Sequence, residues 1–123
     1  MRNRTAGAIV ALVLVVAGCG AQVTPGTTTR IFVQNALAHP LVVRTTGATV
    51  AYFAVPVGAT LEIPGNDPQE AIAIFDDQCV RRSYADGRGE NQAVVFYISD
   101  GTESPGNALP SGAPMASPTD SHC

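Results

Sequence analysis

The chain has no lysine and no tryptophan, and its 123 residues include only seven arginines and two histidines. Without Arg2 and Arg4, which belong to the N-terminal segment described below, five arginines face ten carboxylates, a formal charge of −5. Phosphate backbones and anionic lipid headgroups both attract positively charged surfaces, so this balance matches neither of them. We therefore expect no nucleic-acid partner.

Helical periodicity is missing as well. Beyond residue 18, no stretch keeps apolar residues three and four positions apart for three turns, so the sequence predicts almost no helix. Nucleophilic hydrolysis would need a serine or cysteine beside a base, yet there is no Gly-x-Ser-x-Gly element and His122 belongs to the C-terminal tail. We expect no catalytic residues and no enzymatic activity.

Metal-binding motifs are equally scarce. Carboxylates at expected strand ends or in loops are the candidate calcium ligands: Asp76, Asp77, Asp86, Glu90 and Asp100. They form no D-x-[DN]-x-[DN]-G loop, and we interpret them as solvated turn residues. The residue types of a blue-copper site are present: His39, Cys79, Met115 and His122. No histidine follows the cysteine within a few residues, however, so the sequence predicts no metal site and no cofactor.

The N-terminal segment combines a positive start with a short apolar run. Arg2 and Arg4 precede an apolar stretch over residues 8–17, which is shorter than the roughly 20 residues of a membrane-spanning helix. It ends in Val16-Ala17-Gly18-Cys19, an apolar residue, two small residues and a cysteine. This stretch resembles the signal peptide of bacterial lipoproteins, and the resemblance covers these first residues only.

The resemblance implies that residues 1–18 are removed and that Cys19 carries diacylglycerol and usually a further acyl chain. Two or three chains, with about 0.8 kcal/mol for each buried methylene, hold a protein at a membrane far more firmly than one chain. We therefore expect a lipid anchor at the extracytoplasmic face of the cell membrane. Because Gly20 follows the cysteine, the resemblance implies the outer membrane in a cell with two membranes. The alternative is an ordinary signal peptide whose cleavage site contains a cysteine.

Three cysteines leave a pair once Cys19 is assigned to lipid. Cys79 and Cys123 would then lie in a compartment where disulfides persist, so the sequence predicts a disulfide between them. Joining them closes a loop of about 45 residues and constrains the unfolded chain by roughly 4 kcal/mol in the loop-entropy model. The alternatives are two free thiols, or a Cys123 that pairs with another molecule.

Composition divides the mature chain into a tether, a single domain and a tail. Residues 21–29 are polar and aperiodic, so residues 19–29 are predicted to be the lipidated cysteine and a flexible tether. Residues 30–100 hold the apolar runs and are predicted to form one domain. Residues 101–123 are rich in proline, serine, glycine and alanine, so we expect disorder there apart from a pin at Cys123.

Within the domain, short apolar runs rich in valine, isoleucine and aromatics are bounded by glycine and proline, a pattern typical of β-strands. The expected strands span residues 30–36, 41–46, 49–55, 60–63, 70–76, 80–84 and 93–99. About seven short strands favour a small antiparallel β-sandwich, immunoglobulin-like in architecture, over a closed barrel. The tryptophan and inter-sheet disulfide of immunoglobulin domains are absent, so this prediction rests on strand number.

Two surface features bear on partners. In Tyr52-Phe53 and in Phe96-Tyr97 one ring is expected in the core and the other outward, and two outward rings on one sheet would form an apolar platform. Arg81-Arg82 is interpreted as an edge pair that contacts Asp76 or Asp77, with a docking patch as the alternative.

Together these features favour a non-enzymatic, lipid-anchored interaction or envelope-structural module. Its partner would be an envelope protein or a cell-wall polymer. The alternative is a carrier that binds a small ligand or a metal at the loop end of the sandwich.

Overall fold

The computed structural model describes residues 28–101 and 109–123, which contain seven strands joined by turns. The strands are β1 (Arg30–Asn35), β2 (Leu41–Thr46), β3 (Val50–Val55), β4 (Thr60–Ile63), β5 (Ala71–Phe75), β6 (Arg81–Ala85) and β7 (Ala93–Ile98). Each differs from its predicted range by at most one residue at either end, and the all-β class is confirmed. No helix in the described part of the chain is long and apolar enough to cross a membrane.

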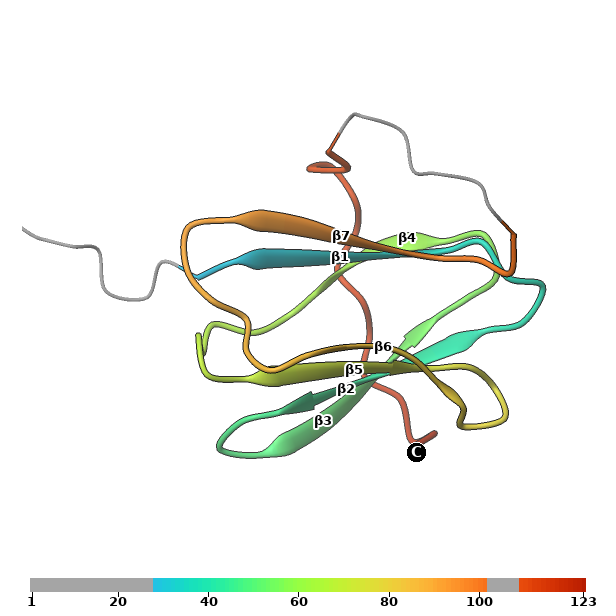
Figure 1. Ribbon diagram of the computed structural model, residues 1–123, viewed down its shortest axis with the longest axis horizontal. Helices are drawn as coiled ribbons and strands as arrows, with labels where there is room; N and C mark the ends of the chain where they lie inside the picture. The colour runs from blue at the N-terminus through green and yellow to red at the C-terminus, as the bar shows by residue number, and fades with distance from the viewer. Residues whose placement is uncertain (1–27, 102–108) are drawn as a thin grey trace, which may run out of the picture.

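The strands form two sheets that pack face to face (Figure 1). One sheet has the order β4-β1-β7 and the other has the order β3-β2-β5-β6. The predicted sandwich is therefore confirmed. The described pairs are antiparallel apart from β1 with β7, which run parallel from Arg30↔Ala93 to Asn35↔Ile98.

The strand order differs from that of an immunoglobulin constant domain, in which the sheets contain strands 1, 2, 5, 4 and 3, 6, 7. Here the first and last strands are neighbours in one sheet. They run parallel because the chain crosses from β6 in one sheet to β7 in the other at the end where β1 begins. The likeness to immunoglobulin domains therefore lies in the layers and the strand number.

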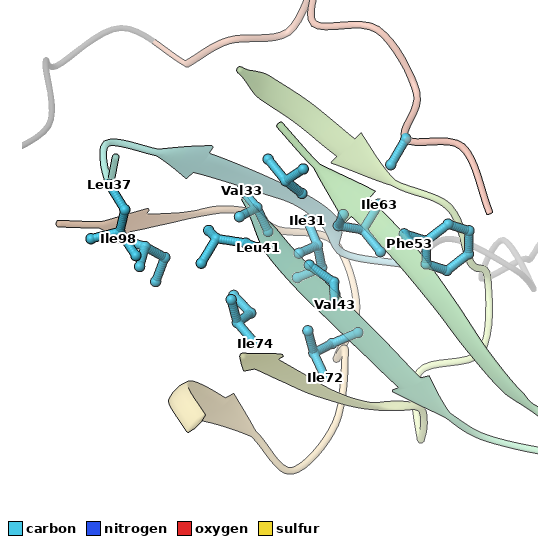
Figure 2. Packing of buried hydrophobic residues seen from close by; sticks show 12 residues of the cluster. Ile31, Val33, Leu37, Leu41, Val43, Phe53, Ile63, Ile72, Ile74 and Ile98 are labelled. Atoms are coloured by element: carbon cyan, nitrogen blue, oxygen red, sulfur yellow. The ribbon is translucent and has the colours of Figure 1, made fainter. Parts of the chain in front are cut away.

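The core lies between the two sheets and follows the alternation of each strand (Figure 2). Its innermost side chains are branched aliphatics of β1 to β5: Ile31, Val33, Leu41, Val43, Val55, Ile63, Ile72 and Ile74. Full burial of one such side chain stabilises a fold by roughly 1.5–3 kcal/mol. These residues therefore hold the two sheets together.

The two ends of the sandwich carry different loops. We call the end where β1 begins the proximal end, and its loops span residues 47–49, 64–70 and 86–92. At the distal end, where β1 finishes, the loops span residues 36–40, 56–59 and 76–80. Figure 1 shows the proximal end at the left and the distal end at the right.

A buried asparagine joins two distal loops. The Asn35 side-chain amide donates to the carbonyl oxygen of His39 at 2.9 Å, and to those of Val55 and Pro56 at 3.0 and 3.2 Å. Its side-chain oxygen accepts a hydrogen bond of 2.9 Å from the Leu37 amide. Because a buried amide without partners is costly, this bonding fixes the β1–β2 loop against the β3–β4 loop.

The prediction of disorder for residues 101–123 is wrong for residues 109–123. Residues 109–123, which we call the strap, lie against the sandwich and cross from the three-stranded to the four-stranded sheet (Figure 1). Residues 102–108 lie outside the described part of the chain. Proline lacks an N–H group, but two amides and two carbonyl oxygens of the strap still pair with strand edges, which offsets part of the entropy of ordering.

The strap bonds to one edge strand of each sheet, β4 and β3. Four main-chain hydrogen bonds of 2.8–3.3 Å join them, with the donor named first: Glu62 to Pro114, Ala116 to Glu62, Ala54 to Ser117 and Thr119 to Tyr52. Between these contacts the side chain of Ala116 belongs to the core cluster and is 5% exposed. The strap therefore closes one side of the sandwich.

Candidate functional site

The distal end carries the disulfide that the cysteine count predicts. Cys79, in the loop between β5 and β6, is bonded to Cys123 of the strap, with a Cα–Cα distance of 5.3 Å. Arg44 of β2 adds a second contact, because its Nη1 donates to the main-chain oxygen of Cys123 at 3.3 Å. These two contacts hold the last residues of the strap over the outer face of the four-stranded sheet.

The loop that presents Cys79 is organised by Asp76. Its Oδ1 accepts hydrogen bonds from the amides of Gln78 and Val80, at 2.9 and 3.0 Å. Cys79 itself has a φ of 59°, a left-handed conformation that non-glycine residues rarely adopt. Such a conformation costs about 1–3 kcal/mol and persists only where its surroundings hold it, which the turn and the disulfide do here.

A pocket of about 220 Å³ lies between this loop, the strap and the four-stranded sheet. Pro40, Val42 and Ala54 supply its apolar surface, residues 76–77 form an acidic side, and residues 121–123 of the strap form another wall. At about 30 Å³ for each water molecule, this volume corresponds to roughly seven waters. The pocket is smaller than drug-sized sites of about 300–1,000 Å³, so it suits a small molecule.

The first carboxylate of the acidic side is already engaged. Hydrogen bonds from the Val80 amide above all, and then from the Gln78 amide and the Arg82 guanidinium, hold the pKa of Asp76 below its ordinary value. Arg82 Nη1 lies 3.5 Å from Oδ2 of Asp76, and its Nη2 donates to Oδ1 of Asp100 at 2.6 Å. The hydrogen bond to Asp100 is the main cause that raises the pKa of Arg82. Asp76 therefore stays charged, and it shares the positive charge of Arg82 with Asp100.

The second carboxylate, Asp77, has a weaker partner. Its Oδ2 lies 3.3 Å from Nδ1 of His39, and the two side chains are 39% and 67% exposed. Exposed pairs of this kind contribute about 0–1 kcal/mol, because water competes for both groups. The Asp77 carboxylate is therefore the lining group that is most readily offered to a ligand.

The strap supplies an imidazole to the same pocket. The ring of His122 packs against that of Tyr52, with centroids 5.7 Å apart, and its Nδ1 lies 3.0 Å from the carbonyl oxygen of Asp120. Since a carbonyl oxygen only accepts hydrogen bonds, Nδ1 carries the proton in this contact, and Nε2 is the acceptor in the neutral ring.

The structure divides the acidic residues singled out in the sequence between the two ends of the sandwich. Asp76, Asp77 and Asp100 lie at the distal end, whereas Asp86 and Glu90 lie in the proximal loop between β6 and β7. Among the described residues, no group of three His, Cys, Asp or Glu side chains could hold a metal ion.

Three of the four copper-type residues lie at the distal pocket, but the cysteine is not free and the methionine lies elsewhere. Cys79 is bonded to Cys123, and Met115 lies beside Glu62 on the β4 edge. His122 lines the distal pocket, and His39 contacts Asp77, which also lines it. Cys19 lies outside the described residues, so its lipidation stays a prediction.

The aromatic pairs do not form a platform on one sheet. Phe53 belongs to the core cluster, and the partly buried Phe96 packs against this cluster, as alternation predicts. Tyr52 and Tyr97 therefore face outward. They belong to β3 and β7, which lie in different sheets. The outward face of Tyr52 is occupied by His122 of the strap.

A bulge in β6 separates the two adjacent arginines. The register shifts where Ile74 pairs with Ser83 and Phe75 pairs with Arg81, which leaves Arg82 as the extra residue. Arg82 reaches Asp76, as the sequence interpretation expects, whereas Arg81 lies over the Tyr84 ring at 4.9 Å. The pair therefore does not present two neighbouring free charges.

Sequence reasoning missed a buried ion pair at the proximal end. Arg88 donates to Oε1 of Glu70 through Nε and Nη2 at 3.1 and 3.0 Å, and its side chain is 1% exposed. It also donates to the carbonyl oxygens of Thr29 and Pro64, at 3.1 and 2.9 Å. This cluster fixes the start of β1 against two proximal loops. The Asp-Gly-Arg-Gly stretch predicts only a turn, so no sequence signal marks the burial of its arginine.

Comparison with known proteins gives no relative for this chain: no family model, no curated protein and no solved structure matches it.

Proposed function

We propose that this protein is a lipid-anchored, extracytoplasmic β-sandwich that acts as a non-enzymatic interaction or envelope-structural module. Cys19 carries the lipid after removal of residues 1–18. The anchor lies in the cell membrane, or in the outer membrane of a cell with two membranes. The partner is an envelope protein or a cell-wall polymer.

The observation that carries this proposal is that the start of β1 and the distal pocket lie at opposite ends of the sandwich. Residues 19–29 lead to β1 at the proximal end, and eleven residues span at most about 36–40 Å. The distal loops lie a strand length further on, roughly 20 Å for six residues. An anchored molecule can therefore hold its distal end well clear of the bilayer.

The Arg88 cluster supports the same arrangement. It bonds Thr29, directly before β1, to the proximal loops, so the last residue before the sandwich has a fixed position. Any tension between anchor and partner then passes directly into β1 instead of unravelling the start of the domain.

The anchor is tested with Cys19→Ser in the cell that makes the protein. The variant should remain an uncleaved or soluble precursor, while the parent protein partitions into the detergent phase on phase separation. Cys79→Ser is the matched control, because it removes a different cysteine and should leave the partitioning unchanged. Recovery of Cys19→Ser in the detergent phase at the size of the mature parent would show that the anchor assignment is wrong.

A second candidate function is that of a carrier for a small ligand at the distal end. The pocket beside Asp77 favours it. Extraction with a mild, chelator-free detergent, followed by intact-mass measurement of the native protein, separates the two functions. A co-purifying protein supports the interaction module, and a retained small molecule supports the carrier.

A further inference from the structure

We propose that the distal pocket binds the ammonium group of a small aliphatic amine, and that the Cys79–Cys123 disulfide keeps this site formed. The inference deepens the carrier function, on whose pocket it rests. It requires no lipid anchor, so a failure of anchoring and a failure of amine binding are separate results.

The lining favours an aliphatic chain that ends in a polar group. Pro40, Val42 and Ala54 present hydrocarbon, and the acidic side begins directly beside them at Asp76 and Asp77. A chain of about four carbons fits a volume of 220 Å³ and removes apolar surface from water at both partners. Its charged end then reaches the carboxylates.

The charge of the pocket selects a cation. None of the described residues that line it is a lysine or an arginine. Two guanidiniums contact lining residues, and both already have partners: Arg82 bonds to Asp76 and Asp100, and Arg44 lies over the Phe75 ring at 5.0 Å and bonds to Cys123. An anion or a carboxylic acid would meet Asp77 without a compensating charge, so it is rejected.

Asp77 is the group that makes the site specific for an ammonium. Its only described ion pair is the exposed contact with His39, which a ligand displaces at little cost. An ammonium has three N–H donors, and the Asp77 carboxylate together with Nε2 of a neutral His122 supplies acceptors in the same pocket. A neutral alcohol of equal length keeps the apolar contacts but loses the charge-assisted hydrogen bond.

The disulfide maintains one wall of the pocket. Ser121, His122 and Cys123 all line it, and they follow the last main-chain bond between the strap and β3, at Thr119. Beyond that bond, these residues are held over the sheet by the disulfide, by the Arg44 contact and by the packing of the His122 ring against Tyr52. Cleavage of the disulfide therefore loosens the wall that carries His122. Ligand binding and disulfide formation are then thermodynamically linked. A ligand that needs this wall stabilises the disulfide against reduction by the same factor by which the disulfide strengthens ligand binding.

The experiment is an NMR titration of the detergent-solubilised mature protein, with n-butylammonium, n-butanol and n-butyrate as probes. Butylammonium should bind with a dissociation constant in the millimolar range and shift the resonances of Asp77, Ala54 and His122, and the other two probes should bind at least tenfold more weakly. Asp77→Asn should weaken butylammonium binding about tenfold. Asp86→Asn, which removes an exposed carboxylate at the proximal end, is the matched control and should leave it unchanged.

Equal binding of butanol and butylammonium, or equal effects of Asp77→Asn and Asp86→Asn, would overturn the assignment. The disulfide is tested with the double variant Cys79→Ser, Cys123→Ser, in which butylammonium binding should fall at least fivefold. Unchanged binding in that variant would refute the role of the wall.

Nα-acetyl-lysine amide carries the same ammonium on a peptide unit. Tighter binding of this probe assigns the ligand to a lysine side chain, and tighter binding of butylammonium assigns it to a free amine.

Discussion

Nη2 of Arg88 lies 3.0 Å from Oε1 of Glu70, and both side chains are withdrawn from solvent, with 1% and 13% exposure. This pair is the one place in the described chain where an ion pair is buried in this way. A buried pair need not stabilise a fold relative to apolar residues, but the loss of one partner leaves the other charge uncompensated.

Arg88→Ala should therefore lower the free energy of unfolding by about 3–5 kcal/mol. The substitution leaves the Glu70 carboxylate and the carbonyl oxygens of Thr29 and Pro64 without their hydrogen-bond donor. Urea denaturation followed by far-UV circular dichroism measures this loss. Arg81→Ala is the control, because Arg81 is exposed over Tyr84 and its removal should cost less than about 1 kcal/mol. Equal losses in the two variants would contradict the structural role of Arg88.

Gly65 and Gly112 form a second matched pair. Gly65 has a φ of +148°, and a Cβ there would collide with Glu70 and Arg88, whereas nothing lies within 4 Å of a Cβ at Gly112. Gly65→Ala should destabilise the protein by about 2 kcal/mol or more through backbone strain and disruption of the ion pair. Gly112→Ala should change stability by less than about 0.5 kcal/mol. The prediction fails if thermal unfolding of the two variants has the same midpoint.

Ala116 tests whether the strap is part of the core. Ala116→Leu adds volume to a packed site and should cost about 1–3 kcal/mol, while Ser117→Leu at the neighbouring exposed position should cost less than about 0.5 kcal/mol. Hydrogen exchange gives an independent measurement. The amides of Glu62 and Ala116 should exchange slowly in the parent protein and faster in Ala116→Leu. Rapid exchange of both amides in the parent would mean that the strap does not hold the β4 edge.

The disulfide should contribute about 2–4 kcal/mol to stability, because it closes a loop between residues 44 positions apart. The double variant Cys79→Ser, Cys123→Ser should therefore unfold at lower guanidinium concentration than the oxidised parent. The parent held in reductant is the matched control and should behave like the variant. Tyrosine fluorescence reports the transition, since the chain has no tryptophan. Coincident curves for the oxidised and reduced parent would contradict this contribution.

Asp76 predicts part of the response to acid. The amides of Val80 and Gln78 lower its pKa in the folded state below the ordinary value of 3.8. A lowered folded-state pKa gives stability that is complete above the unfolded-state value and is lost as the pH falls through the folded-state value. Asp76→Asn should therefore flatten the loss of stability below about pH 4. Asp86→Asn should leave that slope as in the parent, and a slope that is unchanged in Asp76→Asn would contradict the prediction.

Much of the fold follows from local patterns. The alternation of Leu61 and Ile63, and the breaks at Pro56 and Gly58, mark strands whose boundaries the structure reproduces within one residue. The pairing of Cys79 with Cys123 follows from counting cysteines after one is assigned to lipid. The first inference uses the pattern of apolar and turn residues along the chain, and the second uses the number of cysteines. Neither requires knowing how the strands are arranged in space.

The remaining features depend on partners that are distant in sequence. The parallel pairing of β1 with β7 requires knowing which edge of β1 is free after β4 has paired. Burial of Arg88 depends on Glu70, 18 positions away, and arginine is ordinarily exposed. Composition correctly describes the strap as proline-rich, but its order comes from two strand edges that composition cannot reveal.

The central position of β1 in its sheet has a mechanical consequence. A force applied to the chain before Arg30 acts along β1, whose main-chain hydrogen bonds to β4 and β7 run across that direction on both sides. Both ladders must shear together before the strand can slide out, whereas an edge strand pulled sideways would open one bond at a time. A load on the proximal end, where β1 begins, is therefore opposed by both hydrogen-bond ladders of β1.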